Sequence, residues 1–112
     1  MLLAALASVV IASCYDGNTC RPLSGERIRL ACIDAPELEG RRANPLPAKA
    51  SRDYLRSLVL GRTDNLRRIT TDRYGRTVGE LFVGGTNVQQ QMVRSGYAAI
   101  CWKYADQWSW TR

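Results

Sequence analysis

The sequence predicts a small α+β domain, mainly β, in which five short strands form one strongly bent sheet with two short helices. Its 112 residues are enough for one hydrophobic core but not for two. Short apolar segments separated by turn residues make up most of the chain, and two stretches have helical spacing. A five-stranded barrel of the OB type is the most economical arrangement of these elements.

The elements are expected in a definite order along the chain. Strands are marked by β-branched or alternating apolar residues between turn signals, and helices by apolar residues three and four positions apart. The expected elements are a strand from about 8 to the turn at 16, strands over 19–22 and 27–33, a helix over 48–60, strands over 65–71 and 77–83, a helix over 87–95, and a final strand or extended segment over 97–104.

Turn and cap residues set the boundaries of these elements. Asp-Gly-Asn-Thr at 16–19 and Asp-Arg-Tyr-Gly-Arg at 72–76 are typical of hairpin turns. A long polar loop with two prolines is expected over 37–47. Gly61 is placed to end the first helix, and Asn87 to cap the second.

The third expected strand carries a charged residue between apolar ones. By alternation, Ile28, Leu30 and Cys32 share one face, and Arg29 points to the other. Arg29 is therefore a candidate for a pocket outside the core. Pro36 ends this segment.

Composition limits the chemistry that the protein can perform. Sixteen Lys and Arg against ten Asp and Glu give a net charge of +6, and nearly all the cations are arginines, which suits a polyanionic partner. The sequence has no histidine, so Ser-His-Asp and Cys-His schemes and histidine-ligated zinc are excluded. Catalysis would depend on carboxylates, arginines and a hard metal ion.

The four cysteines contain no CxxC pair, so a zinc ribbon or a thioredoxin-type site has little support. Cys14 and Cys20 flank the turn at 16–19, and their spacing fits either a local disulfide or two reduced thiols. Cys32 and Cys101 lie in apolar segments and are expected to be core residues.

The apolar N-terminus permits two interpretations. Residues 1–14 are too few for a membrane span and resemble the apolar part of an export signal. We expect 1–7 to be a signal-peptide remnant, 8–104 the folded domain and 105–112 a short tail, in a secreted or periplasmic protein. The Ile-Ala-Ser-Cys sequence that ends at Cys14 also resembles a lipoprotein cleavage box, but such cleavage would delete the expected first strand.

Three ordered segments carry a resemblance to a known family. They are Tyr-Asp-Gly-Asn-Thr at 15–19, Ile-Arg-Leu-Ala-Cys-Ile-Asp-Ala-Pro-Glu at 28–37, and Asp-Arg-Tyr-Gly-Arg at 72–76. In order and spacing they resemble the signature segments of the staphylococcal nuclease (thermonuclease) family, over roughly residues 8–104. The resemblance implies an OB-fold barrel that hydrolyses phosphodiester bonds of DNA and RNA with calcium as cofactor.

The resemblance also implies roles for individual residues. The implied calcium ligands are Asn18, Asp34 and the backbone carbonyl of Ala35. Asp16 is implied as an acid that lies just outside these ligands. The implied catalytic residues are Glu37 as general base and Arg29 and Arg76 as the arginines on the scissile phosphate. The implied nucleotide contacts are Tyr74, Trp102 and Tyr104.

These roles also have a physical basis. Calcium takes oxygen ligands, and a cation with two guanidinium groups stabilises the charge that develops on a phosphate during cleavage. In a chain without histidine, a carboxylate remains as the base. Aromatic faces bind unstacked bases, which favours single-stranded or frayed substrates. Each motif alone also fits a structural role, and their joint order favours the nuclease.

Two departures from the family pattern modify this expectation. The family usually has aspartate where Asn18 stands, so calcium binding should be weaker and turnover slower. The family usually continues into a further helix beyond position 112, so low stability, or self-association through Trp108 and Trp110, is expected. The alternative function is an OB-fold module that binds nucleic acid without cleaving it.

Overall fold

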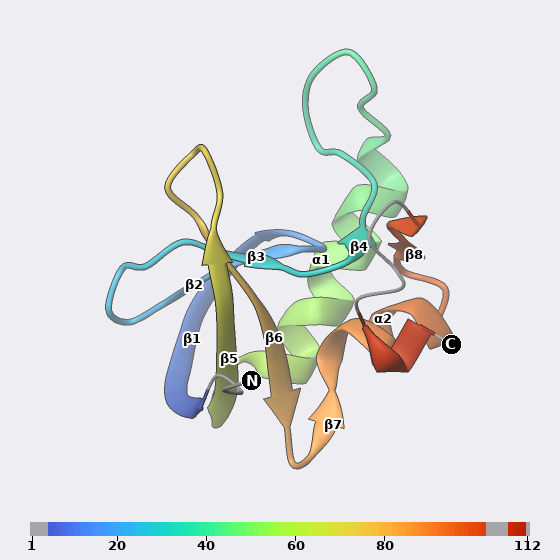
Figure 1. Ribbon diagram of the computed structural model, residues 1–112. Helices are drawn as coiled ribbons and strands as arrows, with labels where there is room; N and C mark the ends of the chain where they lie inside the picture. Colours follow the sequence, from blue (N-terminus) through green and yellow to red (C-terminus); the bar gives the residue numbers. More distant parts are fainter. Residues whose placement is uncertain (1–4, 103–107, 112) are drawn as a thin grey trace.

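One six-stranded sheet, in the order β3-β2-β1-β5-β6-β7, curls until β3 meets β6 and closes a barrel (Figure 1). The computed structural model describes residues 5–102 and 108–111. Its elements are β1 (Leu6–Asp16), β2 (Thr19–Pro22), β3 (Ile28–Leu30), β4 (Ile33–Asp34), α1 (Pro45–Val59), β5 (Thr63–Thr71), β6 (Thr77–Val83), β7 (Thr86–Asn87), α2 (Val88–Arg94) and β8 (Ala99–Ile100). The barrel strands are β1, β2, β3, β5 and β6, which confirms the predicted OB-type α+β architecture.

The barrel closes where β3 runs parallel to β6. The register places Leu30 opposite Gly79, and the Ala31 N–H donates to the Gly79 carbonyl at 2.9 Å. A Cβ atom at position 79 would lie 2.7 Å from the carbonyl oxygen of Arg67 on β5. Glycine is therefore required at the point where three strands approach one another.

Most of the predicted strand positions are confirmed. β2 and β6 have the expected bounds, whereas β1 and β5 each begin two residues earlier, at Leu6 and Thr63. The two early starts have one cause, because these segments pair with each other, from Leu6 opposite Arg67 to Val10 opposite Thr63. Residues 6 and 7 thus form part of the barrel in this structure.

The single strand expected over 27–33 is wrong. The structure divides it into β3 and β4, with a turn at Ala31 and Cys32 between them. Cys32 has φ 65°, in the left-handed region, and is the non-glycine residue with positive φ among those described. The chain therefore changes direction before Asp34, and the expected alternation holds for Ile28 and Leu30 but not for Cys32.

The last strand is shorter than expected. β8 pairs antiparallel with β4, Ile33 lying opposite Ile100 and Asp34 opposite Ala99. The expected range of 97–104 therefore reduces to two residues within the described part of the chain.

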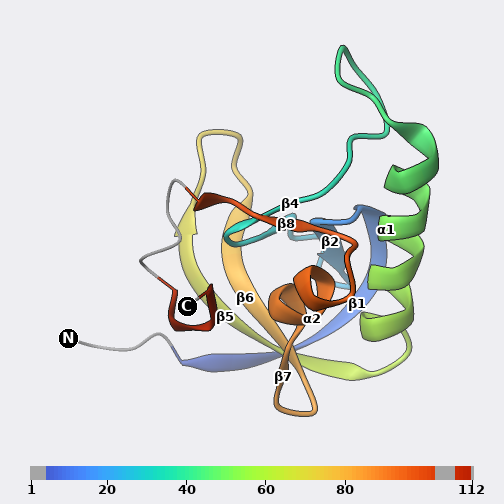
Figure 2. The ribbon, with the colours of Figure 1, turned by 90° about the vertical axis from the view of Figure 1, so that its right-hand side faces the viewer.

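Both helices begin with recognisable signals. α1 starts three residues earlier than expected, because Pro45 and Pro47 lie in its first turn, where a missing N–H is tolerated. The polar loop consequently ends at Asn44. For α2, the Asn87 side chain accepts the Gln90 N–H at 2.9 Å, as the sequence predicts. Figure 2 shows α1 alongside the barrel and α2 between α1 and β6.

The core lies inside the barrel and beneath both helices. Its fully buried aliphatic side chains include Ile28, Leu30, Ile33, Leu55, Leu66, Leu81 and Met92. Trp110, in a short 3-10 helix over Ser109–Thr111, packs against this core, and Trp108 is half-buried as well. The C-terminal tryptophans are thus less exposed than the sequence suggested. Among the described residues, no helix is both long and apolar enough to span a membrane.

The cysteines form one disulfide bond. Cys14 and Cys20 are joined across directly opposed positions of β1 and β2, and both are buried. Cys32 and Cys101 are free and only half-buried, so the expectation that they are core residues is wrong. They lie side by side, with the Cys101 N–H donating to the Cys32 carbonyl at 2.9 Å.

Asp64 on β5 is buried without a partner. Its side chain is inaccessible to solvent, and neither carboxylate oxygen accepts a hydrogen bond from the part of the chain that the structure describes. Burial raises the pKa of Asp64 to about 6, with Arg62 acting in the opposite direction. The folded protein thus binds this proton more tightly than the unfolded chain does, so the ionised carboxylate destabilises the fold.

Replacing Asp64 with Asn should therefore stabilise the protein at neutral pH. The wild-type contribution is unfavourable above the unfolded pKa and grows as the pH rises through about 6. Asp64→Asn should raise the free energy of unfolding by about 2 kcal/mol near pH 7 and by far less near pH 4. Urea denaturation at the two pH values measures this, with the exposed Asp53→Asn as control. An equal effect at both would contradict the assignment.

Candidate functional site

The predicted site residues come from segments that meet at one end of the barrel. The β5–β6 hairpin and the loop over 35–44 project from the same end in Figure 1, and β3 and β4 lie between them. The turn between β1 and β2 lies at the same end, since the Leu30 N–H donates to the Asn18 carbonyl at 2.8 Å. We call this end of the barrel, with its turn, hairpin and loop, the rim.

Arg29 and Asp34 form the central contact of the site. Arg29 Nη2 donates to Asp34 Oδ1 at 3.4 Å. The Arg29 side chain is 20% exposed and that of Asp34 65% exposed, so the arginine lies at the base of the pair and the carboxylate faces solvent. Arg29 also donates through Nη1 to the Leu30 carbonyl, which fixes the orientation of the guanidinium.

Three charged side chains lie close enough to act on Arg29. Burial lowers the pKa of Arg29 from its ordinary value, Asp34 and Asp16 oppose this shift, and Arg76 adds to it. The structure thus brings together Arg29, Asp34, Asp16 and Arg76, which the sequence places up to 60 residues apart.

Asp72 holds the second arginine of the site. Arg76 Nε donates to Asp72 Oδ2 at 2.8 Å, and the N–H groups of Arg76 and Tyr74 both donate to Asp72 Oδ1 at 2.9 Å. Desolvation acts to raise the pKa of Asp72, but these hydrogen bonds outweigh it and leave the pKa below its ordinary value. The Asp72 carboxylate in the hairpin turn therefore orients the Arg76 side chain.

Tyr74 lies at the tip of this hairpin with its ring exposed. The guanidinium carbon of Arg73 is 4.9 Å from the ring centroid, and that of Arg76 is 5.6 Å from it. Arg73 also donates to the Tyr74 hydroxyl at 2.7 Å. The tyrosine is thereby held beside Arg76, where a flat group bound to the site would meet it.

The turn between β1 and β2 is packed tightly against the rest of the site. The Asn18 N–H donates to Asp16 Oδ1, and the Thr19 hydroxyl donates to Asn18 Oδ1, both at 3.0 Å. A Cβ atom at Gly17 would lie 1.9 Å from Ser51 Oγ on α1 and 2.7 Å from Ala35 Cβ. This contact sets the turn directly beside Ala35.

The oxygen atoms at this rim suit a hard cation. Asp34, the Asn18 amide and the Ala35 carbonyl are oxygen donors of the kind that calcium takes, with water completing its six to eight ligands. The described residues contain no cluster of three or more His, Cys, Asp or Glu side chains able to hold a metal. The donor set therefore fits calcium in type but is poor in negative charge.

Three of the predicted site residues are not joined to this cluster. Glu37 is exposed, and its carboxylate makes no hydrogen bond or ion pair with any residue the structure describes, while its carbonyl accepts the Asn44 N–H at 2.8 Å. Trp102 is 71% exposed. Tyr104 lies outside the described residues.

Two residues that build the site carry no individual role in the sequence pattern. Asp72 opens a turn and a signature segment, and an aspartate in that place is a known signal for hydrogen bonds to the following N–H groups. Ser51 falls within the expected helix over 48–60, yet it is fully buried, contacts the Gly17 turn and donates to the Tyr97 carbonyl at 2.7 Å. No local pattern marks that second role.

Replacing Gly17 with Ala should loosen this rim. The added methyl group would overlap Ser51 Oγ, so we expect a loss of about 2 kcal/mol in the free energy of unfolding. The loss should be smaller in a Ser51→Ala background, because the nearest overlapping atom is then absent. Urea denaturation of the four proteins measures the coupling. If Gly17→Ala costs the same in both backgrounds, close packing against Ser51 is not the cause.

Comparison with known proteins identifies the family of this chain. The family model described as "Staphylococcal nuclease homologue" matches residues 27–109. An "Uncharacterized endonuclease" of Escherichia coli is 38% identical over 93 residues, covering 80% of this chain and 58% of that protein. "Staphylococcal-like nuclease CAN1" of Arabidopsis thaliana is 38% identical over 79 residues, covering 70% of this chain and 22% of that protein.

The chain thus spans a little over half of the bacterial relative and about a fifth of the plant one. The family match nevertheless includes β3, β4, both helices and the β5–β6 hairpin, and so covers most of the rim described above. The chain belongs to the staphylococcal nuclease homologue family.

Proposed function

We propose that this protein hydrolyses phosphodiester bonds of DNA and RNA with calcium as its cofactor. The observation that carries the proposal is the cluster of Arg29, Asp34, Asp16 and Arg76 at one end of the barrel, formed by segments far apart in the sequence. Arg29 and Arg76 each have one carboxylate partner, Asp34 and Asp72, and each keeps further donors for an anion. A phosphodiester is an anion that two guanidinium groups bind well.

Arg29 and Arg76 bind the scissile phosphate in this proposal. Arg29 is three-quarters or more shielded from solvent and is held by the Leu30 carbonyl, so its donors have a fixed direction. Arg76 is fixed by Asp72 through Nε, which leaves its terminal nitrogens to reach a ligand. Fixed donors stabilise charge that develops during cleavage without having to reorganise first.

Asp34, Asn18 and the Ala35 carbonyl hold the cation, and Asp16 orients Asn18 through its backbone N–H. When bound, calcium supplies positive charge to a phosphate oxygen and to the attacking water. Asp34 must divide its two oxygens between the cation and Arg29, its ion-pair partner. The neutral amide at position 18 makes this cation site weaker than one with a second aspartate would be.

Glu37 acts as the general base. Its carboxylate is exposed and engages no described residue, so it is available to accept a proton from water. Tyr74 and Trp102 contact the nucleotide through their exposed rings. Because only unstacked bases offer their faces to such rings, single-stranded or frayed substrates are preferred.

The alternative function is a module that binds nucleic acid without cleaving it. The separation of Glu37 from the charged cluster favours this alternative, because a base must come within reach of the water it activates. In a module that only binds nucleic acid, the Arg29–Asp34 ion pair would do no more than orient Arg29. Hydrolysis, and not binding, distinguishes the two.

The disulfide supports an oxidising location. A buried bond between Cys14 and Cys20 is stable outside the reducing cytosol, in agreement with a secreted or periplasmic protein. Lipoprotein processing at Cys14 would remove most of β1 and modify a sulfur that the disulfide uses. Export without lipidation is therefore our proposal.

The first test measures cleavage of a fluorescence-quenched single-stranded DNA across a calcium titration. The wild-type protein should cleave it with calcium and not with a chelator. Glu37→Gln should lower the rate by about 10²- to 10⁴-fold, as removal of a general base does, without altering DNA binding. If folded wild-type protein binds the DNA and cleaves none of it at any calcium concentration, the protein is a binding module.

The second test restores a charge at the cation site. Asn18→Asp should lower the calcium concentration for half-maximal activity about tenfold, because an added carboxylate strengthens a calcium site. Asn65→Asp, on β5, adds the same charge at a distance and should have little effect. Calcium titration of both variants compares them. No shift with Asn18→Asp would remove position 18 from the cation site.

A further inference from the structure

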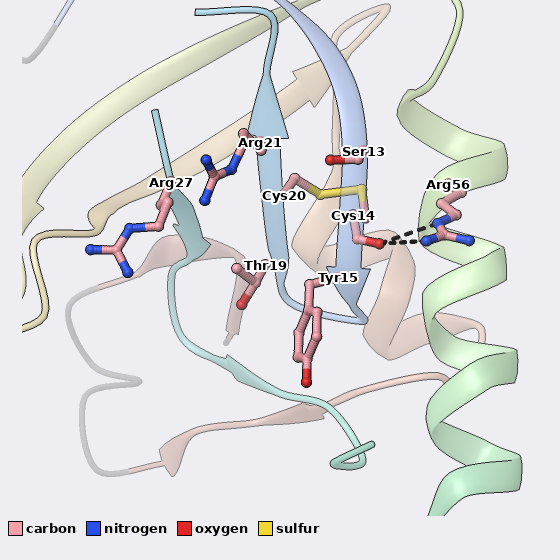
Figure 3. Close-up of a pocket in the computed structure, with 8 residues that line it drawn as sticks. All are labelled: Ser13, Cys14, Tyr15, Thr19, Cys20, Arg21, Arg27 and Arg56. Atoms are coloured by element: carbon pink, nitrogen blue, oxygen red, sulfur yellow. Dashed lines mark hydrogen bonds between the residues drawn. A yellow bond between two sulfur atoms is a disulfide. The ribbon is translucent and has the colours of Figure 1, made fainter. Parts of the chain in front are cut away.

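A groove on the outer face of β1 and β2 has no role in the function proposed so far. It has a volume of about 450 Å³ and is lined by Ser13, Tyr15, Thr19, Arg21, Arg27 and Arg56 above the Cys14–Cys20 disulfide (Figure 3). We propose that this groove binds the phosphodiester backbone of the nucleic acid strand beside the scissile bond. This inference rests on the proposed function, which it extends to a second binding site for the same strand.

The strand register connects the groove to the catalytic rim. Thr19 lies opposite Arg29, and Cys20 opposite Ile28, so the same register places Arg21 beside Arg27. Arg27 directly precedes β3 and lies two residues before Arg29, roughly 7 Å from it along an extended chain. A strand held by Arg29 therefore has the groove directly along its path.

Two of the three arginines that line the groove are free to bind an anion, whereas Arg56 is ion-paired with Asp53 at 3.8 Å. Arg21 and Arg27 are both exposed, and neither has a carboxylate partner in the part of the chain that the structure describes. Arg27 uses one Nη2 hydrogen for the Tyr74 carbonyl and keeps its other donors. By contrast, Arg67 and Arg68 are paired with glutamates.

Arg56 closes the opposite side of the groove. Its Nε and Nη2 donate to the Cys14 carbonyl at 3.2 and 2.9 Å, so its guanidinium is fixed in place, and Asp53 offsets part of its charge (Figure 3). The Cys14–Cys20 disulfide holds the two strands that form the floor. The groove is therefore preformed, which lowers the entropy cost of binding.

Tyr15 adds a surface for a base. Its ring is 56% exposed and lies below Arg21 and Thr19 in Figure 3. The Glu39 carboxylate lies near its hydroxyl, so the Tyr15 end of the groove is less cationic than the Arg21 and Arg27 end. Phosphates at the arginine end and a stacked base at the tyrosine end match this division of charge.

The test compares strand binding by two variants with equal net charge. Arg21→Ala/Arg27→Ala removes the two groove cations, and Arg62→Ala/Arg94→Ala removes two exposed cations elsewhere. Binding of a fluorescein-labelled single-stranded oligonucleotide is measured by polarisation in chelator, so that no cleavage occurs, across salt concentrations. Melting temperatures show that both variants are folded. Arg21→Ala alone is added, because Arg27 also supports the Tyr74 carbonyl.

The groove variant should bind about tenfold more weakly at roughly 0.1 M salt than the control variant. Its plot of log affinity against log salt should be shallower by roughly 1.4, since each phosphate contact to a single strand contributes about 0.7. Arg21→Ala should give about half of that change in slope. Equal affinities and slopes in the groove and control variants would overturn the inference, because net charge alone would then explain binding.

Cleavage assays separate this inference from the proposed function. In kcat/KM, Arg21→Ala, which leaves the contact between Arg27 and the Tyr74 carbonyl intact, should lose about threefold on a long single strand, through KM, and nothing on a dinucleotide that cannot reach the groove. A similar loss on both substrates would overturn the inference. If wild-type protein cleaves neither substrate, the proposed function fails, and the binding comparison still decides whether the groove holds the strand.

Discussion

The parallel pairing of β3 with β6 is the contact on which the site depends. It closes the barrel, and it carries Arg29 on β3 to the hairpin that presents Arg76. Gly79 permits the close approach because any side chain there would meet the backbone of β5. The charged cluster is therefore a consequence of barrel closure, since none of its contacts between β3 and the hairpin is local in sequence.

The turn after β3 is the second constraint. On a straight strand, residues five apart lie roughly 16 Å from each other and point to opposite faces. Arg29 and Asp34 are five apart, yet their side chains are 3.4 Å from each other. The positive φ at Cys32 reverses the chain and brings Asp34 back. The sequence could not predict this turn, because cysteine has no preference for left-handed backbone and the apolar run is typical of one strand.

Features with a local cause were predicted well, and features with a tertiary cause were not. The turn residues at 16–19 and the Asn87 cap act through hydrogen bonds to near neighbours, so the sequence alone indicates them. The start of α1 at Pro45 was missed because proline both ends loops and begins helices. The burial of Ser51 depends on packing between distant segments, for which no pattern exists.

The charges of Arg29, Arg76 and Asp34 explain why we expect this rim to suit a cation and an anion together. Arg29 is largely buried beside Arg76, and its carboxylate partner, Asp34, is also the strongest candidate ligand for a cation. An Asp34 carboxylate that gives one oxygen to a cation weakens its ion pair with Arg29 and leaves donors of that arginine directed at solvent. An anion at that position then satisfies both arginines. We therefore expect cation and phosphate to bind cooperatively, since each removes the electrostatic cost that the other creates.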